Sequence, residues 1–236
     1  MSGVFPAFLI IVFWFSALFL GFSRVQLEAP VDYLIYLWLF FIVDFLFVGL
    51  FIIGHDACHG TVAQKSYRLN LWIGRIAAFL YAGFIFDKLN SEHRAHHKNS
   101  GLTTDPDFHG PRAGDANFLL WLLKFGRHYF SVFQIFYLPA LGNVFMHVFK
   151  IPDANVFYFW VAPSLLSALQ LFYFGTFLPH RNNPKEPSPD NFNARDTKLS
   201  WLWSLLTCYH FGAYHRTHHE KPNLPWFSLP FASTRG

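Results

Sequence analysis

The chain has 236 residues, of which 53% are hydrophobic, 21% aromatic and only 14% charged. Soluble domains carry about 25% charged residues, so this composition and a mean hydropathy of +0.26 exclude an ordinary water-soluble protein and indicate a membrane protein. The formal net charge is +4 and the basic residues are scattered, which argues against nucleic acid as a partner.

Four apolar runs are long enough to cross a bilayer, at residues 6–22, 31–53, 130–149 and 155–178. We expect the first run to be a retained span, because no positive charge precedes it and no small-residue cleavage site follows it. Two shorter apolar stretches, residues 69–86 and 199–214, are predicted to be interfacial or re-entrant. The predicted fold is an all-α integral membrane protein in which residues 1–236 form one membrane domain with four transmembrane helices.

Three short segments place histidines three or four residues apart, which puts them on one face of a helix. Neutral imidazole is the commonest protein ligand for metal ions. Eight such histidines are more than one metal ion takes, so the pattern predicts that the three segments together hold two metal ions. These histidines are His55, His59, His93, His96, His97, His215, His218 and His219.

A shared metal site requires the three segments to lie on one side of the membrane. If residues 69–86 spanned the bilayer, His93 would lie on the opposite side from His55, so we expect this stretch not to span. The resulting topology places 16 of the 18 lysines and arginines on the histidine side, leaving only Arg24 and Lys150 opposite. The positive-inside rule then predicts that the histidines and both termini face the cytoplasm.

The type of ligand does not decide which metal is bound, because a set of nitrogen ligands suits zinc, copper, iron or nickel. A structural zinc site needs only four ligands and does not require a membrane. A pair of redox-active iron ions that activates O2 beside an apolar substrate accounts for all eight histidines and for the membrane. Asp56 and Glu92 are expected to orient ligand rings by hydrogen bonds. The alternatives are histidines that snorkel at the headgroups and a metal transporter, which needs polar residues at several depths of the membrane.

Two further polar residues have open roles. Asp44 sits eleven residues before His55, about 16 Å deeper at 1.5 Å per residue. It either lines a substrate tunnel or holds two helices together. His210 precedes His215 by five residues and points away from it on a continuous helix, which favours a role next to the ligands or the substrate. Cys58 and Cys208 lack metal-ligand spacing and are expected to be core thiols.

The histidine arrangement resembles the membrane fatty acid desaturase and hydroxylase superfamily. The phrases around it, from about residue 45 to 230, resemble the bacterial β-carotene ketolases. Cys58 stands where many relatives carry Met, and Thr217 where Glu is common. The phrases are His55-Asp56-Ala57-Cys58-His59-Gly60-Thr61, Tyr81-Ala82-Gly83-Phe84, Asp105-Pro106-Asp107-Phe108-His109, Arg127-His128-Tyr129-Phe130, Phe174-Gly175-Thr176-Phe177-Leu178-Pro179-His180-Arg181, Phe192-Asn193-Ala194-Arg195 and Leu205-Leu206-Thr207-Cys208-Tyr209-His210-Phe211-Gly212.

This resemblance implies two Fe2+ ions, O2 as co-substrate and an external electron donor. It implies that C4 of a β-ionone ring is hydroxylated twice and loses water to give a ketone, so that β-carotene becomes echinenone and canthaxanthin. A carotenoid 3-hydroxylase or a lipid desaturase on the same scaffold is the alternative. The resemblance further implies the bacterial inner membrane and an acidic ferredoxin-type donor at the basic cytoplasmic face.

The superfamily often adds a ninth nitrogen ligand where a late span meets the site. His180 occupies that place and is either this ligand or a helix cap. His128 is expected to snorkel at an interface, and no role is assigned to His109 or His147.

Overall fold

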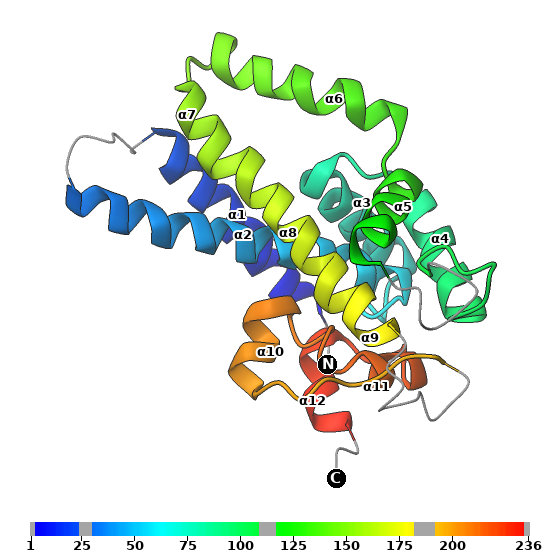
Figure 1. Ribbon diagram of the computed structural model, residues 1–236. Helices are drawn as coiled ribbons and strands as arrows, with labels where there is room; N and C mark the ends of the chain where they lie inside the picture. The colour runs from blue at the N-terminus through cyan, green and yellow to red at the C-terminus, as the bar shows by residue number, and fades with distance from the viewer. Residues whose placement is uncertain (1–2, 24–29, 109–116, 182–191, 234–236) are drawn as a thin grey trace.

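The computed structural model describes residues 3–23, 30–108, 117–181 and 192–233, and every regular element in these ranges is a helix. The centre of the bundle is α2 (Pro30–Cys58), which packs against α1 (Val4–Ser23), α3 (Tyr67–Ala82) and α8 (Ala162–Leu171) (Figure 1). The first part of α2 exposes large apolar side chains such as Trp38, whereas its second part, from Val43 onward, is almost wholly buried. The buried part carries His55 at its end.

One long helix runs without interruption from Asp153 to His180. It contains α7 (Asp153–Val156), α8 and α9 (Leu178–His180), joined by two wider π-helical stretches, η2 (Phe157–Val161) and η3 (Phe172–Phe177). Such wide turns occur inside α-helices, frequently near functional sites. The second stretch lies just before His180.

Three helices are long and apolar enough to cross a membrane: α1, the Tyr33–Cys58 part of α2, and Asp153–His180. Two bent pairs raise the number to as many as five if each pair counts as one span. They are α3 with α4 (Phe86–Asn99), bent by 99°, and α5 (Phe118–Tyr129) with Val132–Val148, bent by 86°. The exposed apolar side chains on these helices, among them Phe5 and Phe136, suit contact with lipid rather than water.

These spans agree in part with the sequence prediction. The first, second and fourth predicted runs lie within the three long helices. The third, residues 130–149, corresponds to α6 (Val132–Asn143) and η1 (Val144–Val148), which pass the test for a span only together with α5. The break falls at Phe130 and Ser131, where Ser131 and Gln134 form a capping box that starts a new helix.

The segment predicted not to span, residues 69–86, is mostly α3. Ser66 caps its first turn by accepting a hydrogen bond from the Leu69 N–H. Gly83 ends it in the left-handed region at φ +67°, which an L-residue rarely adopts. Phe86 then begins α4, which returns the chain to the end of α2 that carries His55.

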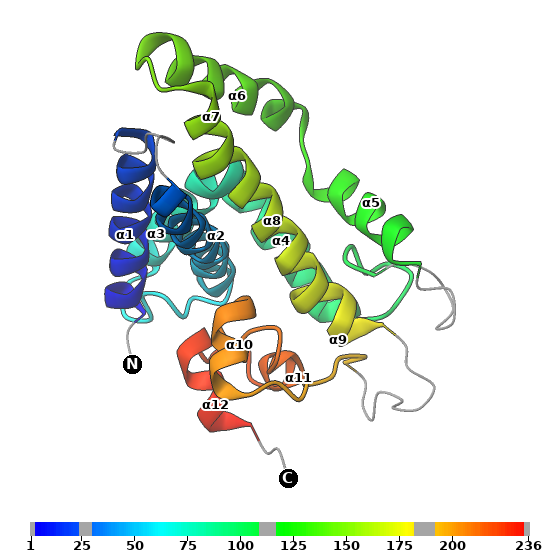
Figure 2. The same ribbon diagram turned by 60° about the vertical axis from the view of Figure 1, so that its left-hand side comes forward.

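The second predicted interfacial segment, residues 199–214, is helical only in α10 (Trp201–Cys208). Tyr209 and His210 have positive φ angles and end the helix, so the continuous helix assumed from the sequence is wrong there. The chain turns into α11 (His215–Glu220), followed by η4 (Trp226–Ser228) and α12 (Leu229–Ala232). Figures 1 and 2 show these elements gathered at the end of the molecule where α1 begins, with α6 at the opposite end.

Candidate metal centre

The nine histidines predicted as metal ligands lie in two adjacent groups, and all are buried except His59 and His97, which are half-buried. Within each group, one nitrogen atom per ring lies within 4.8 Å of one nitrogen of every other ring. The five-histidine cluster contains His55, His59, His93, His97 and His218. The four-histidine cluster contains His96, His180, His215 and His219.

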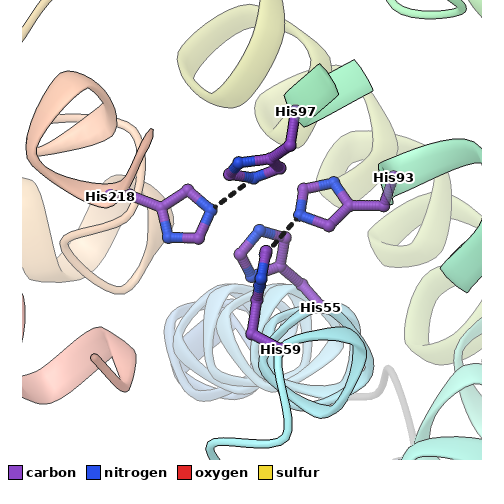
Figure 3. Close-up of side chains that lie close together, drawn as sticks. All are labelled: His55, His59, His93, His97 and His218. Atoms are coloured by element: carbon purple, nitrogen blue, oxygen red, sulfur yellow. Dashed lines mark hydrogen bonds between the residues drawn. The ribbon is translucent and has the colours of Figure 1, made fainter. Parts of the chain in front are cut away.

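The five-histidine cluster joins three helices, because α2, α4 and α11 each contribute to it (Figure 3). Nε2 of His59 lies 2.7 Å from Nε2 of His93, and Nε2 of His97 lies 3.0 Å from Nε2 of His218. Nε2 of His55 is buried and has no hydrogen-bond partner among the described residues. The Nε2 atoms therefore face one another, as they do around a shared cation.

The four-histidine cluster forms a chain of close Nε2 contacts. His180 and His215 approach to 2.7 Å, His215 and His219 to 3.1 Å, and His219 and His96 to 3.2 Å. A neutral imidazole has one N–H and one lone pair, so protons on these atoms satisfy only part of the chain. Converging lone pairs from nitrogen ligands fit a transition metal such as iron or zinc.

Two of these rings are held in place from the outside. Nδ1 of His96 donates to Asp105 Oδ1 at 2.9 Å, and Nδ1 of His180 donates to the Asn193 carbonyl at 2.8 Å. Each bond fixes the proton on Nδ1 and leaves Nε2 free to face the cluster. His180 therefore has the geometry of a ligand, with its Nδ1 bonded outward.

Asp56 lies where a ring-orienting carboxylate was predicted. Its Oδ1 atom is 3.3 Å from Nδ1 of His55, and its Oδ2 atom accepts a hydrogen bond from the Trp226 N–H at 3.0 Å. The carboxylate thus links α2 to the C-terminal segment.

Protonation of the clusters is controlled by burial and by two carboxylates. Burial lowers the pKa values of His215, His218 and His219 well below the ordinary range, so these imidazoles are neutral and their lone pairs are available. His96 differs: burial opposes its charged form, but the carboxylates of Asp107 and Asp105 outweigh burial and raise its pKa.

The carboxylate of Asp196 holds the first turn of α11 in place. Thr217 donates both its backbone N–H and its hydroxyl to Asp196, at 3.1 and 2.7 Å. Asp196 thereby satisfies an N–H in the first turn of a helix that has no side-chain cap of its own. A segment distant in sequence thus supplies a carboxylate beside Thr217.

The other predicted residues lie elsewhere. Glu92 turns to His128, whose Nε2 atom is 2.8 Å from its carboxylate, rather than to a cluster ring. His210 belongs to neither cluster; its Nδ1 atom lies 2.6 Å from Ser204 Oγ. Asp44 is buried, and its Oδ1 atom has no hydrogen-bond partner among the described residues. His147 is exposed, and His109 lies outside the described residues.

Three residues next to the four-histidine cluster were not predicted as site residues. The sequence marks Asp105 and Asp107 only as part of a ketolase-like phrase, although carboxylates shortly after a histidine segment are a signal for ring-orienting groups. Tyr129 donates to Asp107 Oδ1 at 2.5 Å. These contacts join the loop after α4 to the end of α5, a pairing that no local pattern encodes.

A cavity of about 460 Å³ adjoins both clusters. Its inner end is lined by His55 and His93 of one cluster and by His96 and His215 of the other, and its walls are almost entirely apolar. This volume lies in the range of about 300–1,000 Å³ that is usual for small-molecule sites. An apolar molecule in this cavity would lie directly against both histidine clusters.

Comparison with known proteins agrees with this geometry. The fatty acid desaturase family model matches residues 31–158 and 128–235. A β-carotene ketolase of Paracoccus sp. (strain N81106 / MBIC 01143) is 42% identical over 82% of this chain and 77% of its own length. A β-carotene 4-ketolase of Haematococcus lacustris is 40% identical over 81% of this chain and 60% of its own, and a zeaxanthin 4-ketolase of Chlamydomonas reinhardtii is 34% identical over 98% and 53%. No solved structure matches the chain.

The helices of the described residues are those of an integral membrane protein, and the two histidine clusters fit a metal centre. The chain belongs to the fatty acid desaturase family, and within that family it groups with the β-carotene ketolases.

Proposed function

We propose that this protein is a β-carotene ketolase, an O2-dependent di-iron enzyme that converts the C4 methylene of a β-ionone ring to a ketone. The observation that carries the proposal is the apolar cavity that ends on histidines of both clusters. The names of the similar ketolases supply the substrate class.

The nine clustered histidines are proposed to hold two iron ions, five around one and four around the other. When bound, the iron pair supplies the activation of O2 and the removal of hydrogen. The protein orients the rings through Asp105 and the Asn193 carbonyl, and the buried cavity excludes water from the reacting carbon. Asp56 is proposed to steady His55, whereas Glu92 and His210 take no part in holding iron.

The overall reaction balances as two successive hydroxylations of one carbon, each of which consumes one O2, two external electrons and two protons and releases one water. The geminal diol then loses a further water and becomes the ketone. The cavity serves this sequence because it holds the same ring against the same clusters through both oxidations.

We also propose the topology that the charge distribution predicts: one membrane domain with four spans, in the bacterial inner membrane, with the histidine clusters on the cytoplasmic side. The α3–α4 reversal supports it by returning His93 to the end of α2 that carries His55. Fusions to green fluorescent protein and to alkaline phosphatase at residue 150 and at the C-terminus test it. Fluorescence at the C-terminus and phosphatase activity at residue 150 are expected; the reverse pattern contradicts the topology.

Electrons are proposed to come from an acidic ferredoxin-type protein. The exposed bases Lys65, Arg68, Arg94 and Lys98 lie on α4 and beside the start of α3, next to the cluster histidines, and form a surface of complementary charge.

The decisive experiment expresses the chain in cells that accumulate β-carotene and separates the pigments. Echinenone and canthaxanthin are expected. Zeaxanthin indicates a 3-hydroxylase instead, and unchanged β-carotene in cells that contain folded, iron-loaded protein rejects the proposal.

A further inference from the structure

The two ends of the apolar cavity differ in exposure. At the inner end, the side chains of His55, His96 and His215 are 1–3% exposed. At the other end, the lining residues Leu165 and Leu169 of α8 are 65% and 41% exposed, and Phe130, at the break between α5 and α6, is 48% exposed. The cavity therefore opens sideways, between α8 and the α5–α6 break.

The opening lies in an exposed apolar surface of the kind that contacts lipid. α8 belongs to the long apolar helix Asp153–His180, and outside the cavity lining the same helix exposes Phe157 and Tyr158. The residues at the opening are apolar as well. An apolar molecule dissolved in the bilayer reaches the cavity through this opening without entering water.

The cavity is shorter than a carotenoid. Its lining on the long helix extends from Ser164 to Thr176, which corresponds to about 18 Å at 1.5 Å per residue. A carotenoid with a ring at each end is about as long as the hydrocarbon core of a bilayer is thick, about 30 Å. One ring and part of the polyene fit inside, and the remainder extends through the opening.

The outer half of the cavity offers little polar recognition. Four lining residues carry hydroxyls: Tyr81, Tyr129, Ser164 and Thr176. In the outer half, Ser164 donates to the Val161 carbonyl at 2.8 Å, and Tyr81 accepts from Ser167 at 3.3 Å. Both hydroxyls are already hydrogen-bonded to protein, so this half is suited to a plain hydrocarbon chain.

We infer that the enzyme binds one end group at a time through this lateral opening and leaves the far end of the carotenoid in the bilayer. The inference rests on the proposed function. It follows that a substrate with two rings leaves after the first ketone is made and enters again in the reverse direction for the second.

Substrates that differ only at the far end test the inference. Membranes that contain the full iron-loaded chain are supplied with an electron donor and one of three carotenoids: β-carotene, one with a β-ring and an acyclic far end, and one whose far ring carries a sugar. Equal rates per β-ring are expected. If the far end were held in a pocket, these changes would lower the rate by about tenfold or more, and that result overturns the inference.

A labelling experiment tests the opening without relying on turnover. Leu165→Cys is treated with a lipid-soluble maleimide, with and without β-carotene, against Phe157→Cys on the exposed side of the same helix. The unsubstituted chain, in which Cys208 is buried and Cys58 lines the cavity, gives the background labelling that is subtracted from both variants. Slower labelling with β-carotene is expected at 165 only. Unchanged labelling at 165 overturns the inference. If this protection is seen but β-carotene is not oxidised, the proposed function fails while the opening stands.

Discussion

At the scale of single residues, Asp105 links the loop that follows α4 to His96 of the four-histidine cluster. Its carboxylate accepts hydrogen bonds from His96 Nδ1 and from the backbone N–H groups of Gly101 and Asp107. All of these partners donate hydrogen bonds. An asparagine amide replaces one acceptor oxygen by an NH2 group, so one of the donors would face another donor and lose its hydrogen bond.

Asp105→Asn is therefore expected to lower iron affinity and turnover by about 10- to 100-fold, as loss of a ring-orienting partner does in other metal sites. Iron content and initial rates measure the effect. Asp87→Asn, at an exposed carboxylate paired with Arg75, is the matched control. Normal iron content and rate in the Asp105 variant contradict an orienting role.

His180→Ala tests the ninth ligand. Removal of one of four buried nitrogens is expected to leave the five-histidine cluster filled and the other empty, so iron falls to half. Turnover is expected to fall by about 100-fold or more, because loss of an orienting partner alone costs nearly as much. His147→Ala, at an exposed histidine in neither cluster, serves as the control. Full iron content in the His180 variant means that His180 only packs against the clusters.

Sequence spacing singled out eight of the nine clustered histidines, and the family resemblance added His180 as either a ligand or a helix cap, but neither showed how the nine divide. His93, His96 and His97 share one turn of α4, yet His96 joins one cluster and the other two join its neighbour. The allocation depends on where α11 and His180 lie, which is set by contacts between residues more than a hundred positions apart, such as His96 with His219. For the same reason the sequence did not reveal the role of Asp196, because its partner Thr217 lies in a different segment.

At the scale of elements, the close approach of α3 to α2 positions the clusters. Gly74 of α3 lies against Ala57 of α2 and Phe86 of α4, and a Cβ atom at Gly74 would be 2.6 Å from each of them. Small residues at helix contacts in membranes allow this approach. Ala57 lies between the cluster histidines of α2, so the contact fixes their distance from α4.

Gly74→Ala is expected to destabilise the fold by about 1–3 kcal/mol through overpacking and to reduce iron retention. Thermal unfolding in detergent measures the change. The matched control is Gly142→Ala, where a Cβ atom meets only Trp160 at an ordinary 3.5 Å. If the two variants have equal melting temperatures, α3 can move away from α2 without loss of stability, which contradicts the prediction.

Hydropathy located the long helices but not the bends. Hydropathy predicts the run at residues 130–149 as one span by itself, whereas this run is preceded by α5 and the chain bends by 86° between the two. The signal was present in Ser131 and Gln134, which form a capping box inside an apolar stretch. α5 itself carries Trp121 and Tyr129 into the interior, so its apolar face covers protein as well as lipid.

At the scale of the whole molecule, the exposed bases that are proposed to dock the electron donor lie beside the histidine clusters. Turnover with an acidic ferredoxin-type donor is expected to fall by about tenfold between low salt and 0.5 M salt, where the Debye length is only a few ångströms. Turnover with a small uncharged reductant is expected to stay constant.

Lys98→Glu, beside the clusters, is expected to raise the KM for the protein donor, whereas Lys150→Glu, at the start of the link to the long helix, leaves it unchanged. Initial rates at varied donor concentration measure both values. A salt-independent rate with every acidic donor contradicts docking at this surface.

The position of α11 also determines the order in which the protein matures. This helix gives His218 to one cluster and His215 and His219 to the other, and it is synthesised after every candidate span. A ribosome therefore completes neither cluster until the membrane helices before it have been made. With iron bound as proposed, its uptake is a late step in biogenesis, and a partly inserted chain would not assemble the iron pair.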